Sequence, residues 1–334
     1  MNEFQRYLVE EFVEDYQERR LSRREALKLI ASITGSLIAA HTFLAACAPS
    51  PQTAPTALPT STAPPTDAPS LSPTSAPEPT APPTPAEASA TATAPSLSGT
   101  VSPEDPAIEA APVQFPDEGT TLMGYLARPI GDGPFPVVLV CHENRGLTEH
   151  IRDVTRRLAK AGYVALAVDL LSRQGGTEAI GSGDVPGVLG NMPPDQFVQD
   201  FLSGWRYLQD QSFAQADRVG MVGFCFGGGV TWRVATEMPE LKAAVPFYGP
   251  HPSVDAVPNI NAAVLAVYAE RDQRINQGIP AMEAAMQQNN KVYEKVIYPD
   301  ADHAFHNDTG SRYNPEAARD AWARTLAWFE RYLK

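Results

Sequence analysis

The chain has 334 residues and a formal net charge of −13 at neutral pH, from 26 Lys and Arg against 39 Asp and Glu. This acidic balance disfavours nucleic acid and anionic membrane surfaces as partners, because both carry the same sign of charge. The three cysteines, Cys47, Cys141 and Cys225, are too few for a disulfide framework and lack metal-ligand spacing. The sequence therefore implies no metal and no other cofactor.

The first segment of the chain is acidic and places apolar side chains at helical spacing. These side chains are Phe4, Tyr7, Leu8, Phe12 and Tyr16. The spacing predicts an amphipathic helix. Nothing in the sequence shows what this helix contacts.

Residues 1–46 together have the organisation of an export signal. Residues 22–28 resemble a twin-arginine signal through Arg23 and Arg24, although Ala26 stands where an aromatic residue is usual. An uncharged stretch of 18 residues, 29–46, follows.

The uncharged stretch ends in Leu44, Ala45, Ala46 and Cys47, which resembles a lipoprotein processing box. We expect cleavage before Cys47 and lipidation of its thiol, because small residues before the cysteine suit cleavage. The alternative is an uncleaved transmembrane anchor, since the apolar length just suffices to cross a bilayer. Both interpretations place the protein outside the cytoplasm and tether it to a membrane.

Residues 47–103 are interpreted as a disordered linker that begins at the lipidated cysteine. Between Ala48 and Thr100 the chain holds 14 of the 32 prolines and no Lys or Arg. Such a composition cannot bury a core and favours an extended, semi-rigid spacer.

Residues 104–334 have the length of one α/β domain. Strand-like apolar runs alternate with helical patterns along this region. The strand-like runs lie at 121–127, 136–141, 163–168, 218–224, 243–248, 263–269 and 291–298. The helical patterns lie at 148–161, 196–210, 227–237, 279–288 and 315–332. Alternation of this kind predicts a mostly parallel sheet with helices on both faces.

Cys225 lies in the pattern Gly-x-Cys-x-Gly, between a strand-like run and a helical pattern. This is the sequence form of a nucleophile elbow, in which glycines allow a tight turn and the side chain between them points outward. A sulfur at the N-terminal end of a helix is expected to favour the thiolate. The other interpretation is a buried cysteine in a glycine-rich turn.

An acid and a histidine follow in the chain order that α/β-hydrolases use. Asp272 comes directly after the strand-like run 263–269, and His303 comes after 291–298. Asp300 or Asp302 could pair with the histidine in place of Asp272, and His306 competes with His303. Placement and order favour Cys225, Asp272 and His303 as a catalytic triad.

Residues 112–334 resemble the dienelactone hydrolase family, cysteine-dependent α/β-hydrolases that open small lactones and esters. The resemblance is carried by the blocks PVVLVCHENRGL (136–147), GYVALAVDLLSRQG (162–175), VGFCFGGG (222–229), FYG (247–249), YAERD (268–272) and DADHAFHN (300–307). It implies an α/β-hydrolase fold with an eight-stranded, mostly parallel sheet and helices on both faces.

The resemblance also implies a role for Glu143, which would lie beside the thiol and control its ionisation. A carboxylate near a thiol raises the thiol's pKa by repulsion. The alternative is a salt bridge from Glu143 to Arg145. The fold further implies an oxyanion hole made of the backbone N–H groups of Phe226 and Asn144.

The sequence departs from the family at the arginines that bind the lactone substrate, which have no clear counterpart. Arg145, Arg173 or Arg312 could substitute, and no spacing selects one of them. Cys141 precedes Glu143 by two residues on the same strand face. We interpret it as a buried core residue, with a disulfide to Cys225 as the alternative.

Two functions remain open at this point. The first is a membrane-tethered, extracytoplasmic hydrolase of small esters or lactones. The second is a surface lipoprotein that binds a ligand in the same pocket without catalysis. Neither the substrate nor the oligomeric state follows from the sequence.

Overall fold

A computed structural model describes residues 1–46 and 99–334. The described residues form one compact unit, which includes the three N-terminal helices. The lipidation predicted at Cys47 and most of the predicted linker lie outside these residues.

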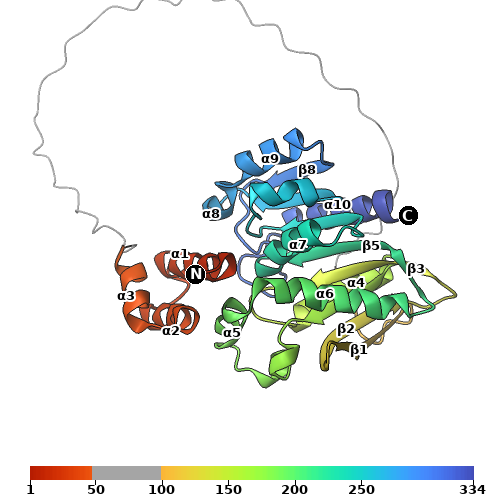
Figure 1. Ribbon diagram of the computed structural model, residues 1–334, viewed down its shortest axis with the longest axis horizontal. Helices are drawn as coiled ribbons and strands as arrows, with labels where there is room; N and C mark the ends of the chain where they lie inside the picture. The colour runs from red at the N-terminus through yellow and green to blue at the C-terminus, as the bar shows by residue number, and fades with distance from the viewer. Residues whose placement is uncertain (47–98) are drawn as a thin grey trace, which may run out of the picture. The chain divides into compact units, whose positions relative to one another are not determined.

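The centre of the fold is an eight-stranded sheet in the order β1-β2-β4-β3-β5-β6-β7-β8 (Figure 1). The pairs β1/β2 and β2/β4 are antiparallel, and all other neighbours are parallel. The strands are β1 Ile108–Asp117, β2 Thr120–Pro129, β3 Phe135–Cys141, β4 Val164–Asp169, β5 Ala214–Phe224, β6 Ala243–Phe247, β7 Ala263–Ala269 and β8 Tyr293–Tyr298. The predicted fold class is confirmed.

Seven of these strands match the strand-like runs of the sequence, and β1 is the one that the sequence analysis missed. β1 contains Pro112 and Pro116 and pairs with β2 alone. Prolines are tolerated in an edge strand because its outer N–H groups need no partner. The same prolines hide the strand from pattern analysis.

The helices that follow the strands are α4 Glu149–Lys160, α5 Val185–Asn191, α6 Pro194–Gln209, α7 Phe226–Glu237, α8 Gln273–Asn276, α9 Ile279–Gln288 and α10 Pro315–Leu333. Short 3₁₀ turns occur at Ser172–Gln174, Thr177–Ala179 and Val254–Asn259. The five helices predicted in this region are confirmed, whereas α5 and α8 were not predicted.

Two glycines of β5 show on which face of the sheet α7 and α10 lie. A Cβ on Gly220 of β5 would meet Phe329 and Leu333 of α10, whereas a Cβ on Gly223 would meet Gly227 and Thr231 of α7. Residues an odd number apart in a strand point to opposite faces. The helices α7 and α10 therefore cover opposite faces of the sheet.

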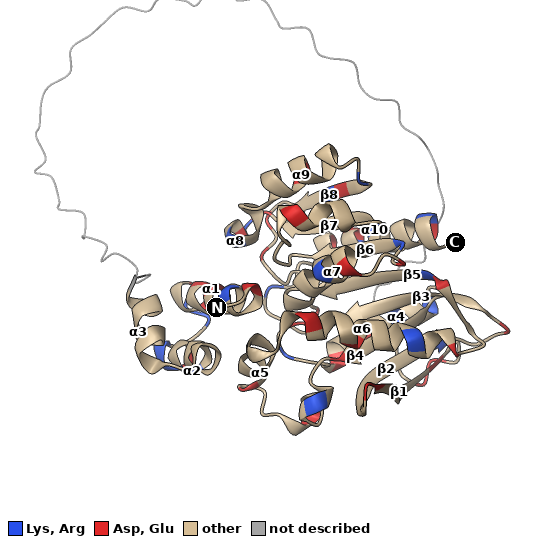
Figure 2. Cartoon of the chain, viewed as in Figure 1, with Lys and Arg blue, Asp and Glu red and all other residues tan. Residues whose placement is uncertain are grey.

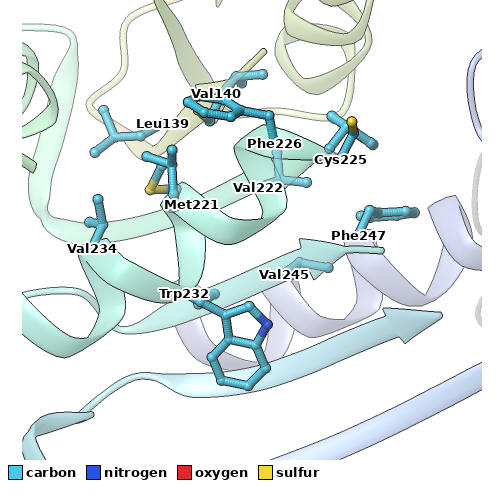
Figure 3. Close-up of a cluster of buried hydrophobic side chains, with 14 of the residues drawn as sticks. Leu139, Val140, Met221, Val222, Cys225, Phe226, Trp232, Val234, Val245 and Phe247 are labelled. Carbon is cyan, nitrogen blue, oxygen red and sulfur yellow. The ribbon is translucent and has the colours of Figure 1, made fainter. Parts of the chain in front are cut away.

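The central strands are almost entirely apolar because both of their faces are covered. Every residue of β4, β6 and β7 is buried. Charged residues lie mainly on the helices and loops around these strands (Figure 2). Figure 3 shows the apolar cluster where β3, β5 and β6 meet α7, with Cys225 at its edge.

The N-terminal segment forms three helices, α1 Glu3–Gln17, α2 Arg23–Thr34 and α3 Leu37–Ala46. Asn2 begins α1 with a capping box. The presence of α1 confirms the amphipathic helix that the sequence predicted. Gly35 adopts a left-handed conformation and ends α2, so the uncharged stretch 29–46 is divided between two helices. Within residues 1–46 and 99–334, no helix combines the length and the apolar character needed to cross a membrane.

We expect the substitution Gly223→Ala to destabilise the fold by roughly 1–3 kcal/mol, because the new Cβ would overlap backbone that cannot move away. The ideal Cβ would lie 2.1 Å from the carbonyl oxygen of Gly227. Gly310→Ala is the matched control, since its nearest neighbour would be 3.5 Å away. Urea unfolding of the three proteins tests this, and equal stabilities would contradict it.

Candidate active site

Cys225 occupies the turn between β5 and α7, with φ of 58° and ψ of −120°. A positive φ is strained for a residue with a Cβ and persists only where the surroundings enforce it. Two backbone hydrogen bonds do so here. The N–H of Cys225 donates to the carbonyl of Phe247 at 3.1 Å, and the N–H of Gly228 donates to the carbonyl of Cys225 at 2.9 Å. The predicted elbow geometry is therefore present.

His303 lies in the loop after β8, and its Nδ1 is 2.6 Å from Oδ2 of Asp272. Asp272 follows β7 and also accepts a hydrogen bond from the N–H of Ile275 at the start of α8. The competing acids are placed elsewhere. Asp300 and Asp302 lie 2.8 and 3.6 Å from the guanidinium of Arg271.

The ionisation of the buried Asp272–His303 pair is set by attraction within it. Burial alone would lower the pKa of His303, but the negative charges of Asp272 and Cys225 outweigh burial and raise it to about 10. Burial likewise opposes ionisation of Asp272, yet His303 holds the pKa of that carboxyl below its ordinary value. Part of this rise comes from the negative charge of a Cys225 thiolate, so the imidazolium is stabilised most once the thiol has lost its proton.

His306, the alternative histidine, belongs to the core. Its ring stacks on Phe224 at 4.9 Å and contacts Phe247 and Trp322. Burial, followed by the charge of His150, lowers the pKa of His306 well below its usual range. This histidine is a packing residue and does not face the sulfur.

Glu143 and Asn144 follow β3 and are both buried beside the elbow. The Nδ2 of Asn307 donates to Glu143 at 2.8 Å, whereas Arg145 is exposed. Phe226 begins α7 directly after Cys225. The two residues predicted to supply oxyanion N–H groups therefore lie at the start of α7 and in the loop that follows β3.

A cavity of about 500 Å³ reaches Cys225. Its walls include Glu143, Asn144, Asn307 and Arg312. The N-terminal segment completes them with Glu11, Phe12, Asp15, Arg20 and Leu21. The volume falls in the range of small-molecule sites. Cys141 lies outside this cavity wall and, like Cys225, carries a free thiol.

Comparison with known proteins agrees with this geometry. The dienelactone hydrolase family matches residues 122–333. The "Putative carboxymethylenebutenolidase" of Escherichia coli (strain K12) is 36% identical over 253 residues, covering 70% of this chain and 92% of the relative.

The chain belongs to the dienelactone hydrolase family.

Further members support the same assignment. A relative of the same name from Saccharolobus solfataricus is 31% identical, covering 66% of this chain and 98% of its own length. The crystal structure of "Putative Dienelactone Hydrolase" from Klebsiella pneumoniae superposes with a TM-score of 0.64 at 37% identity, covering 68% of this chain and all of that one. This member of the family is accordingly a hydrolase of carboxylic esters or lactones, which decides against the ligand-binding alternative.

The family match begins after the three N-terminal helices, yet α1 supplies two groups to the site of this hydrolase. The hydroxyl of Tyr7 lies 3.2 Å from Sγ of Cys225 and 3.4 Å from Nε2 of His303. The carboxylate oxygens of Glu11 lie 3.7 and 3.8 Å from the same sulfur. The sequence analysis found the helix but missed both residues as parts of the site.

One electrostatic prediction from the sequence, about the thiol of Cys225, is wrong. The helix position of Cys225 predicted a favoured thiolate, whereas its pKa is raised. Burial is the largest cause, and the negative charge of Glu11 is the next. The positive charge of His303 acts in the opposite direction without outweighing them.

Arginines around the site are mostly paired with α1. Nε of Arg274 lies 3.2 Å from Glu14, and its guanidinium stands 4.6 Å from the ring centre of Tyr7. Arg312 lies 3.5 Å from Asp15. Arg173 instead pairs with Asp117 and Asp200 at the other edge of the sheet, so it is not a substrate ligand.

One group of side chains in the described part of the chain has the composition of a metal site. Donor atoms of Glu11, Cys225 and His303 all lie within 4.8 Å of one another. Carboxylate, thiolate and imidazole are the donor types that Zn²⁺ prefers. Such binding would occupy the sulfur and therefore compete with any nucleophilic role.

We expect Glu11→Gln to lower the pKa of Cys225, because it removes a negative charge that opposes thiolate formation. The rate of Cys225 alkylation by iodoacetamide would then rise at a lower pH than in the wild type. Glu10→Gln removes the same charge from an exposed position of the same helix and should leave the profile unchanged. An unshifted Glu11→Gln profile would contradict this reading.

Proposed function

We propose that this hydrolase cleaves small esters or lactones through a thioester on Cys225, with His303 as general base and Asp272 as its partner. The observation that carries the proposal is the 2.6 Å contact between Asp272 and Nδ1 of His303. An ionised carboxylate can only accept, so Nδ1 keeps its proton and Nε2 is left to serve the sulfur.

In the first half of the reaction, Nε2 of His303 takes the thiol proton while Sγ attacks the carbonyl carbon. The resulting oxyanion is held by the backbone N–H groups of Phe226 and Asn144. The carbon–oxygen bond then breaks, and His303 returns the proton to the leaving alkoxide. The acyl group stays on the sulfur as a thioester.

In the second half, His303 takes a proton from a water molecule that attacks the thioester. The carbon–sulfur bond breaks, the proton returns to Sγ, and the carboxylic acid leaves. The raised pKa of His303 favours the imidazolium that forms in both halves. The Asp272–His303 pair therefore stabilises the transition states, in which His303 is becoming charged, more than the resting state, in which Cys225 is a neutral thiol.

We assign Glu143 a modulating role within the same proposal. Its charge contributes to the raised pKa of Cys225, and its carboxylate accepts a hydrogen bond from Asn307. Movement of Glu143 would change the ionisation of the thiol without changing the triad.

The second part of the proposal concerns location. The twin-arginine pattern and the processing box before Cys47 support an exported lipoprotein, tethered by its lipid and lifted from the membrane by the Pro-rich segment. The substrate would then be met outside the cytoplasm.

We expect Cys225→Ala and His303→Ala each to lower turnover of p-nitrophenyl acetate by roughly a thousandfold or more, and the double variant to be no slower than either, because the groups act as one unit. Cys141→Ala is the control and should retain turnover, since that thiol lies outside the cavity wall. A double variant much slower than both single ones would separate the two residues mechanistically.

We expect Cys47→Ala to release the protein from the membrane fraction into the soluble fraction, because the thioether that carries the lipid cannot form. Replacing Arg23 and Arg24 with Lys should block export. Detergent partitioning of extracts from cells expressing each protein measures both effects. Wild-type protein found entirely in the aqueous phase would refute the lipid anchor.

A further inference from the structure

The nucleophile of this hydrolase is covered by a helix from the other end of the chain. Sγ of Cys225 is in contact with Tyr7 and Glu11 of α1, and the cysteine is only 3% exposed. A carbonyl carbon must come within about 3–3.5 Å of a nucleophile before reaction. The Tyr7 hydroxyl already occupies such a position, 3.2 Å from the sulfur, and the Glu11 carboxylate lies just beyond it at 3.7 Å.

The side chains of α1 that dock it are apolar and deeply buried. Phe4 packs its ring against Phe197 and Phe226, with centroids 5.2 and 5.0 Å apart. Leu8, one turn later on the same face, is fully buried. The helix is therefore seated on the first residue of α7, directly beside the elbow.

Polar contacts hold α1 in position on both sides of the buried residues Phe4 and Leu8. Glu3 pairs with Arg233, Glu14 with Arg274, and Asp15 with Arg312. Within the site, Nδ2 of Asn144 donates to Glu11 at 3.1 Å. The backbone N–H of Asn144 is also a proposed oxyanion donor, so α1 contacts both the nucleophile and the side chain of a residue expected to bind the oxyanion.

We propose that α1 is an intramolecular inhibitor that closes the active site until the N-terminal segment is removed. The inference rests on the proposed role of Cys225 as nucleophile. Tyr7 blocks the sulfur and the imidazole, while Glu11 opposes ionisation of the thiol.

The position of the processing box makes removal of α1 a single step. The helices α1, α2 and α3 contact one another in series, and α3 ends at Ala46. Hydrolysis of the Ala46–Cys47 peptide bond by a processing peptidase consumes one water molecule and separates all three helices covalently from the catalytic region. After this cleavage only non-covalent contacts retain α1, and its dissociation opens the cavity. The enzyme then becomes active where it is anchored.

The test compares two double variants of the full-length chain, each carrying Cys47→Ala so that the N-terminal segment stays attached. The variant with Phe4→Ser and Leu8→Ser lacks the two buried apolar side chains that dock α1. Arg6→Ser with Glu10→Ser is the matched control, because it has the same spacing on the exposed side of α1. Both pairs leave the net charge unchanged.

We expect the first pair to raise both the alkylation rate of Cys225 and kcat/KM for p-nitrophenyl acetate by roughly tenfold or more, because each follows the fraction of open molecules. The control pair should stay within about twofold of the parent, as surface substitutions do. Alkylation is measured by mass analysis of the Cys225 peptide. Unchanged alkylation in a folded Phe4/Leu8 variant would overturn the proposal, and so would faster alkylation with lower turnover.

A second measurement does not depend on the folding of those variants. A site-specific protease sequence replacing residues 55–60 allows the folded full-length protein to be cut after it is made. Cutting followed by gel filtration should raise turnover, and adding back a peptide of residues 1–20 should lower it again. Loss of turnover on cutting would show that α1 contributes to catalysis and would overturn the proposal.

These measurements also separate this proposal from the thioester mechanism. Faster alkylation of the Phe4/Leu8 variant supports closure by α1 even if no form of the protein hydrolyses the ester, whereas a fall in turnover below that of the parent would count against it. Ester hydrolysis that survives Cys225→Ala would count against the thioester mechanism alone.

Discussion

The close approach of β5 and α7 is the constraint on which the active site depends. A side chain on Gly223 would overlap the carbonyl of Gly227, so the strand and the helix can meet only without one. This approach forces Cys225 into a positive φ and turns its sulfur outward at the end of the sheet. The N-terminus of α7 and the loop after β3 are then in place around the sulfur.

Parallel strand order brings the other proposed catalytic residues to this local turn. Loops that follow parallel strands emerge at the same edge of the sheet. Glu143 follows β3, Asp272 follows β7 and His303 follows β8. Residues far apart in sequence therefore meet at one edge, and each needs only the correct position after its own strand.

The docked helix α1 changes the chemistry of this arrangement, because it places Tyr7 and Glu11 beside the sulfur. The Asp272–His303 pair is formed, yet Glu11 and burial keep the pKa of the neighbouring thiol high. A family alignment would not reveal this state, because the match starts at residue 122. The proposed control over access to Cys225 thus comes from a segment that precedes the part of the chain matched by the family.

The sequence by itself determined seven of the eight strands, the elbow and the order of Cys225, Asp272 and His303, because apolar periodicity and glycine requirements are local. It left open which acid pairs with His303, since Asp272 and Asp300 both follow strands, and the tertiary structure decided for Asp272. It predicted the α1 helix, but only the structure placed Tyr7 on a sulfur 218 residues away. The docking of α1 depends on the fit between two surfaces whose residues lie far apart in the sequence, and a local sequence pattern does not predict such a fit.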